Sequence, residues 1–194
     1  MKIMSFRRPA GGAVIIPPSF TLIPDSAVVA GNTPMFLADF SHQWAGEVSL
    51  AFRVGRLGKN IARKFAPRYI DGVTLALRAV ALDLDAELQQ QGAATGLCGA
   101  FDNGIALGRW LPVGPDQPLS ADGIYKVSFE GLTADIADEA ADIDTVLSLV
   151  SNYLTVKTGD IVMPCRVGER FPLRPDTVVT ATLGSEEVLR IKIK

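Results

Sequence analysis

Histidine and cysteine are scarce in this sequence, which contains one histidine and two cysteines. His42 alone cannot form a multi-histidine metal site and argues against a histidine-based catalytic triad. It stands in Ser-His-Gln-Trp, which indicates a surface loop residue, with a general base as the alternative. Cys98 and Cys165 are too few for a disulfide framework, and they favour two packed thiols in a reducing compartment. Dinucleotide and phosphate-loop glycine motifs are absent as well.

The sequence also lacks a surplus of charge and any long apolar run. The chain contains 19 lysines and arginines and 21 acidic residues, which gives a net charge of −2. This balance argues against nucleic acid and a membrane surface as partners. The apolar run 13–16 is too short for the core of an export signal. No stretch approaches the roughly 20 apolar residues of a membrane span. We therefore expect a cytoplasmic protein that binds neither membrane nor nucleic acid.

The 194 residues, 48% hydrophobic and 21% charged, have the composition of a globular chain that can bury a core. This length favours one domain over residues 1–194. Residues 1–33 are rich in proline and glycine and predict loops and short edge strands. Apolar patterns predict strands at 47–54, the first half of 73–82, 125–129, 161–163, 177–183 and 188–193, and helices at 83–91 and 142–153. Apolar residues within 55–68 have helical spacing, and a loop is predicted at 110–118. Strands and helices do not alternate, which predicts an α+β fold.

Two features could carry chemistry. Acidic residues gather at Asp83, Asp85 and Glu87 and again within 135–144, and such clusters either hold a hard cation or form solvated helix faces. Arg78 lies inside an otherwise apolar strand, where a charge must reach water or find a partner. Arg78 is therefore singled out for a structural or functional role.

Several segments resemble one known family. Residues 34–41 read Pro-Met-Phe-Leu-Ala-Asp-Phe-Ser, residues 46–50 Gly-Glu-Val-Ser-Leu, and 56–71 begin Arg-Leu-Gly-Lys-Asn-Ile-Ala. Residues 100–104 read Ala-Phe-Asp-Asn-Gly. Residues 157–163, which follow the predicted helix at 142–153, read Lys-Thr-Gly-Asp-Ile-Val-Met. In order and spacing these segments resemble the fumarylacetoacetate hydrolase (FAH) family, above all its short bacterial members that act on 2-oxo acids.

The resemblance implies a mixed β-sandwich roll with short flanking helices, and a homodimer. It also implies Mg²⁺ or Mn²⁺ held by a Glu-X-Glu pair and an Asp, together with a substrate-contacting lysine just before Phe-Asp. The three metal positions fall on Glu47, Ser49 and Arg78, so two of three carboxylates are missing. The lysine position falls on Gly99, while Phe101 and Asp102 remain. A loop that follows the Gly-Asp turn in the family is replaced by a segment that includes Arg166.

These replacements predict a degenerate metal site without a cofactor. We expect the Arg78 guanidinium to pair with Glu47 in the space of the ion, with Arg78 and Arg166 able to hold a small carboxylate. The favoured interpretation is a non-catalytic binding or interaction protein that has lost the C–C hydrolase activity. The alternatives are an enzyme with rewired chemistry that uses these arginines, and an active Mg²⁺-dependent hydrolase, acylpyruvase or oxaloacetate decarboxylase for small 2-oxo acids.

Overall fold

The computed structural model describes residues 1–6, 19–31, 33–113, 126–129, 132–135, 143–164 and 166–194. The strands of the larger sheet are β1 (Lys2–Phe6), β2 (Phe20–Pro24), β3 (Trp44–Val54), β4 (Ile70–Ala81), β5 (Ile105–Leu107), β6 (Leu111–Pro112), β9 (Ile161–Met163) and β10 (Arg166–Pro172). The strands of the smaller sheet are β7 (Lys126–Phe129), β8 (Leu132–Asp135), β11 (Val178–Leu183) and β12 (Glu186–Lys192). The α-helices are α1 (Leu82–Gln90) and α3 (Ile143–Tyr153), and the 3₁₀ helices are η1 (Asp25–Ala27), η2 (Arg63–Tyr69) and η3 (Gly96–Gly99).

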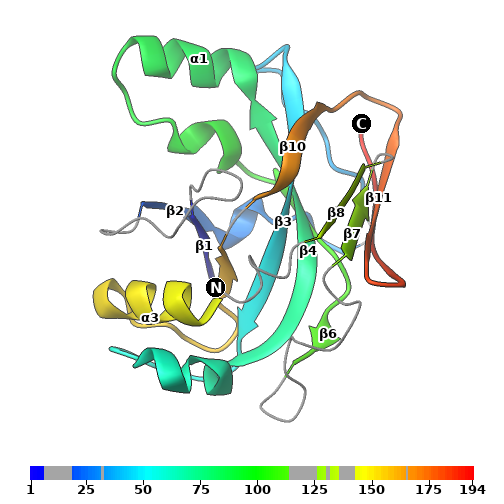
Figure 1. The fold of residues 1–194 in the computed structure, drawn as a ribbon. Helices are drawn as coiled ribbons and strands as arrows, with labels where there is room; N and C mark the ends of the chain where they lie inside the picture. Colours follow the sequence, from blue (N-terminus) through cyan, green and yellow to red (C-terminus); the bar gives the residue numbers. More distant parts are fainter. Residues whose placement is uncertain (7–18, 32, 114–125, 130–131, 136–142, 165) are drawn as a thin grey trace.

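The larger sheet has the order β2-β1-β9-β3-β4-β5, with β10 added to β3 and β6 to β4. The pairing of β1 with β9 is parallel, whereas β3 and β4 form a long antiparallel pair. The smaller sheet, in the order β12-β11-β7-β8, contacts β4 through β11 and β12. In Figure 1, α1 and α3 lie at opposite ends of the β3–β4 pair, and β10 crosses beside β3. The predicted α+β class and mixed sheet with short helices are confirmed.

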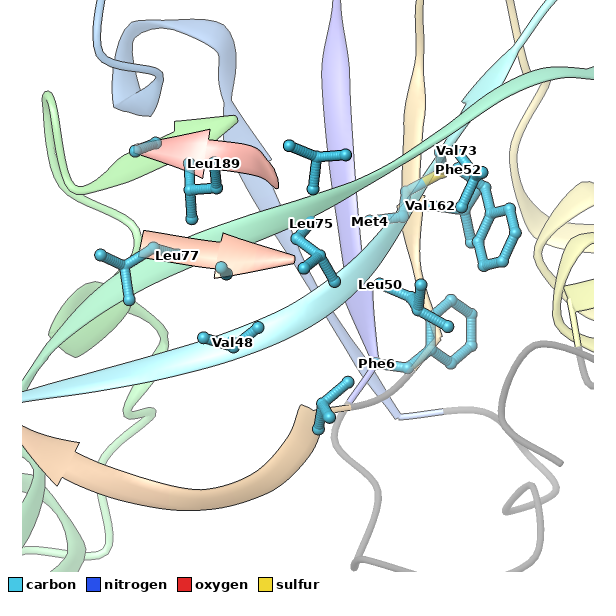
Figure 2. Close-up of a cluster of buried hydrophobic side chains, with 14 of the residues drawn as sticks. Met4, Phe6, Val48, Leu50, Phe52, Val73, Leu75, Leu77, Val162 and Leu189 are labelled. Atoms are coloured by element: carbon cyan, nitrogen blue, oxygen red, sulfur yellow. The ribbon is translucent and has the colours of Figure 1, made fainter. Parts of the chain in front are cut away.

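The main core joins residues of β3 and β4 with residues of β11, β12 and α3, and the alternation of side-chain direction along β3 decides which of its residues take part. Val48, Leu50 and Phe52 point from β3 into a cluster that also receives Leu75 from β4 and Leu189 from β12 (Figure 2). The intervening residues of β3 point to the other face of the sheet. That second face carries a smaller apolar cluster and the polar site around residue 47.

Several predicted elements differ in extent from those in the structure. All of β4 is strand, including its alanine-rich second half, because it stays paired with β3 as far as Ala81. The helical spacing near residue 61 is a 3₁₀ helix that starts at Arg63 and contains Pro67, which cannot donate an α-helical hydrogen bond. The predicted loop at 110–118 includes the short strand β6, and its residues from 114 onward lie outside the described part of the chain.

The amino-terminal segment also contains more regular structure than expected. β1 is an inner strand between β2 and β9, because the prolines of this segment begin only at Pro9, after β1 has ended. The strands predicted at 125–129 and 161–163, the carboxy-terminal hairpin and the helix at 83–91 are confirmed to within a few residues. The helix predicted at 142–153 is α3, while its predicted Asp142 cap lies outside the described residues. No helix in the described part of the chain is long and apolar enough to cross a membrane.

Candidate functional site

A buried carboxylate and an arginine face each other at the start of the central strand pair. Glu47 on β3 and Arg78 on β4 are direct cross-strand partners, so their side chains leave the sheet on the same face. Glu47 is 3% exposed, which makes an uncompensated charge there costly. Arg78 donates to Glu47 Oε2 through Nε at 3.0 Å and through Nη2. The predicted ion pair between these two residues is confirmed.

Gly99 makes room for this arginine. A Cβ atom at Gly99 would lie 3.2 Å from Arg78 Cδ and 3.3 Å from its Nε, closer than ordinary packing allows. The resemblance places a lysine at Gly99 and a metal-binding Asp at Arg78. The absence of a side chain at Gly99 on η3 therefore leaves room for the Arg78 side chain from β4.

Two further arginines reach the same carboxylate from β10. Arg170 Nε donates to Glu47 Oε1 at 2.6 Å, and its Nη1 lies 3.8 Å from Asp85 Oδ2 of α1. Arg166 Nη1 is 3.9 Å from Glu47 Oε1. Arg78 Nη1 also donates to the Ser5 hydroxyl on β1 at 3.4 Å. The site therefore joins four strands and one helix around Glu47.

Sequence reasoning missed Arg170 because its position depends on an irregularity in β10. Val167 pairs with Val48, and Phe171 pairs with Gly46. Between these two pairs β10 advances by four residues, whereas β3 advances by two. Gly168, at φ 65°, lies within this bulge. A regular strand would place residue 168 opposite Glu47, whereas the bulge brings Arg170 there. The charge at residue 170 is visible in the sequence, but the bulge that directs it is not.

The arginines decide the ionisation of Glu47. Burial alone would raise the pKa of Glu47, but the charges and hydrogen bonds of Arg78 and Arg170 outweigh burial and hold the pKa below its usual 4.5. Glu47 is therefore ionised at neutral pH. Its buried negative charge is more than balanced by the guanidinium groups around it.

The remaining predicted positions are divided between this site and another cluster. Ser49 is 4% exposed, and in the sheet it is paired with Arg166. Phe101 instead packs its ring against Phe40 and Trp44, with ring centroids 5.2 Å away in both cases. Asp102 is exposed and forms no ion pair with another described residue. The assignment of these positions as remnants of a metal site and substrate pocket remains a prediction.

The acidic residues of α1 have structural roles in this fold. Asp83 accepts hydrogen bonds from the Ser41 hydroxyl, from the His42 backbone N–H at 2.9 Å and from the Leu84 N–H at 2.9 Å. These bonds anchor the loop before β3 to the first turn of α1. Asp85 is buried rather than solvated, and it lies beside Arg170. The side chain of His42 is exposed, as expected of a loop residue.

The Asp83 bonds predict a pH-dependent contribution to stability. The His42 N–H and the Ser41 hydroxyl lower the pKa of Asp83 from 3.8 to about 2. A carboxylate with a lowered pKa stabilises the fold fully above the unfolded pKa, and this contribution is lost as pH falls toward 2. We expect Asp83→Asn to cost about 1 kcal/mol at pH 7, with the cost shrinking between pH 4 and 2.

Urea unfolding at several pH values measures this difference. The matched control is Asp39→Asn, because Asp39 is exposed and has no ion pair among the described residues. An Asp83→Asn cost that stays constant from pH 7 to pH 2 would contradict the role given to the carboxylate.

Known proteins with similar sequences or folds span most of this chain. The chain is 24% identical over 191 residues to the mitochondrial oxaloacetate tautomerase FAHD1 of Mus musculus, covering 93% of this chain and 83% of the relative. It is 26% identical over 189 residues to the oxaloacetate tautomerase YcgM of Escherichia coli K12, covering 92% and 83%. A fumarylacetoacetate hydrolase family protein from Yersinia pestis superposes with a TM-score of 0.84 at 19% identity, over 100% of this chain and 93% of that one.

The prediction that no cofactor takes part is contradicted by a further structural relative. A fumarylpyruvate hydrolase from Pseudomonas aeruginosa was solved in complex with Mn²⁺ and pyruvate, and it shares the fold with a TM-score of 0.76 at 17% identity, over 99% and 88% of the two chains. A fold relative of this chain thus binds a divalent ion. The prediction was wrong because it inferred the absence of a cofactor only from the loss of two metal-binding carboxylates.

The residues around Glu47 do not by themselves fit such an ion. Both oxygens of Glu47 are in ion pairs with arginine, and the described residues contain no group of three or more acidic, histidine or cysteine side chains that could hold a metal. A hard divalent ion requires several oxygen ligands. In its present arrangement, Glu47 is therefore an acceptor for arginines and not a metal ligand.

The evidence for the family does not depend on these few positions. The family model described as fumarylacetoacetate (FAA) hydrolase C-terminal matches residues 3–164, which is most of the chain. The matched span includes β1 from Ile3 onward, the β3–β4 pair, the helices α1 and α3, and β9. It stops just before β10, which carries two of the arginines of the site. This chain belongs to the fumarylacetoacetate hydrolase family.

Proposed function

We propose that this chain is an enzyme that binds small 2-oxo acids and catalyses their keto–enol tautomerisation or decarboxylation. Relatives over most of its length are named as oxaloacetate tautomerases, and one as an oxaloacetate decarboxylase. The observation that supports the proposal is the cluster of Arg78, Arg166 and Arg170 around the buried Glu47. This cluster occupies the sheet position to which the resemblance assigns the reaction centre of the family.

The chemistry requires stabilisation of negative charge on an oxygen. Tautomerisation and decarboxylation of 2-oxo acids both pass through an enolate, and fixed positive groups aimed at that oxygen lower the barrier. Arg78 and Arg170 are held in place by Glu47, so they keep their positions while the charge develops. The arginines of this chain bind and orient the anion.

A second candidate is a protein that binds such acids without converting them. Ser49 and Arg78 stand where the resemblance places two metal-binding carboxylates, and Gly99 stands where it places a lysine. Each missing group could cost on the order of 10²–10³-fold in rate. This candidate predicts carboxylate binding without measurable turnover.

The deciding experiment is a turnover assay of the purified chain. Ketonisation of enol-oxaloacetate, decarboxylation of oxaloacetate and hydrolysis of acylpyruvates are followed with and without Mg²⁺ or Mn²⁺. We expect turnover above about 1 s⁻¹ on at least one substrate and a loss of about 10²-fold or more in Glu47→Gln.

The matched control is Arg190→Gln, which removes an exposed arginine of β12 that lies outside the cluster and pairs with Glu187. Its rate is expected to equal that of the unaltered chain. Absence of turnover under every condition, together with saturable binding of pyruvate, would reject the enzyme in favour of the second candidate. A single domain over 1–194, a homodimer and a cytoplasmic location remain part of this proposal.

A further inference from the structure

We propose that Arg166 is the specificity-determining residue that recognises the carboxylate of the ligand at this site. The inference rests on the proposed function, because it assigns a part of the same site. Arg78 and Arg170 have a different role, because they hold the buried carboxylate of Glu47. The hydrogen bonds, charges and burial around Glu47 distinguish these two roles.

The first step is that Arg78 and Arg170 are committed to Glu47. Each donates directly to one oxygen of this buried carboxylate, Arg78 to Oε2 and Arg170 to Oε1. Neither can leave without stranding a buried charge, which is strongly destabilising. These two arginines therefore act as fixed parts of the structure.

The guanidinium of Arg166 is held less tightly. Its Nε donates to the Gly168 carbonyl at 2.9 Å, which fixes one edge of the group. Its Nη1 is 3.9 Å from Glu47, beyond hydrogen-bond range, and its Nη2 is 3.5 Å from Glu169, whose side chain is 82% exposed. The two Nη atoms thus form a fork without a close, buried acceptor among the described residues. A carboxylate matches this fork through two parallel hydrogen bonds.

The charge balance favours one ligand carboxylate next to Arg166. Among the described residues, three arginines surround two buried carboxylates, Glu47 and Asp85, so this part of the cluster has one positive charge in excess. Glu169 contributes little because water screens its exposed charge. A ligand carboxylate next to Arg166 would balance the cluster.

A neutral hydrogen-bonding group lies beside the same arginine. Ser49 is paired with Arg166 across the β3–β10 ladder and leaves β3 on the same face as Glu47. The Ser49 hydroxyl is buried, and it has no hydrogen-bond partner among the described residues. Buried hydroxyls are normally satisfied. A second oxygen of the ligand, such as a 2-oxo group next to the carboxylate, would supply that partner.

Binding of pyruvate and pyruvamide, measured by calorimetry, tests the inference without a need for turnover. We expect pyruvate to bind and pyruvamide, which lacks the negative charge, to bind at least about tenfold more weakly. Arg166→Gln should weaken pyruvate binding by about tenfold or more, and Arg166→Lys by less, because lysine keeps the charge but loses the fork. Arg190→Gln is the matched control and should bind as the unaltered chain does.

Equal pyruvate affinity in Arg166→Gln and in the unaltered chain would overturn the inference, as would the absence of pyruvate binding to the unaltered chain. A melting temperature of Arg166→Gln close to that of the unaltered chain shows that a lost affinity is not due to unfolding. Arg166-dependent binding without turnover would count against the proposed enzyme alone. Turnover with an unchanged KM in Arg166→Gln would count against the role of Arg166 alone.

Discussion

Replacing Arg78 with alanine is expected to lower the free energy of unfolding by about 3 kcal/mol or more. The change removes two hydrogen bonds to Glu47, a carboxylate with almost no exposed surface. Arg170 would still hold the other oxygen, but Glu47 Oε2 would be left buried without its donor. Urea unfolding followed by circular dichroism measures the loss.

A double-mutant cycle shows whether the loss comes from the stranded charge. Glu47→Ala combined with Arg78→Ala should recover part of the stability, because the carboxylate that lost its partner is also gone. The control is Arg53→Ala, since Arg53 pairs with Asp71 where both side chains are well exposed, and such pairs contribute about 1 kcal/mol or less. Strictly additive losses in the cycle, or an Arg78→Ala loss no greater than that of Arg53→Ala, would contradict the assignment.

Replacing Gly46 with alanine is expected to cost about 2–3 kcal/mol. A Cβ atom at Gly46 would lie 2.6 Å from Cζ of Phe171, whose ring covers this glycine on the core side of β3. The ring would have to move, and Arg170, its neighbour along β10, would move with it. We therefore expect Gly46→Ala to lower both the melting temperature and any activity that depends on Glu47.

A second substitution, at Phe171, tests whether the steric conflict with Gly46→Ala causes the loss. Phe171→Leu shortens the side chain, so the double variant with Gly46→Ala should lose less stability than the two single losses added together. Gly96→Ala is the matched control, because among the described residues a Cβ atom there would meet only a Thr21 methyl group at 3.4 Å. If Gly46→Ala were as stable as Gly96→Ala, the close approach of Phe171 would not limit this position.

The sequence by itself determined the class of fold, the family resemblance and the central contact of the site. Strands such as 161–163 and the carboxy-terminal hairpin could be read because their apolar patterns and turn residues are local signals. The pairing of Glu47 with Arg78 could be predicted because both lie in one antiparallel strand pair, where register follows from residue spacing. The resemblance supplied that spacing, and the strand register in the structure agrees with it.

Tertiary structure alone decided which other charges meet Glu47. Arg170 reaches it through a bulge in β10, and Asp85 is buried because α1 brings it beside Arg170. Phe101 packs in an aromatic cluster with Phe40 and Trp44, residues far from it in the chain. Local sequence patterns report which residues share a strand or a helix face. They do not report how a bulge shifts one strand against its neighbour, because that depends on packing between segments far apart in the chain, such as β10 and β3.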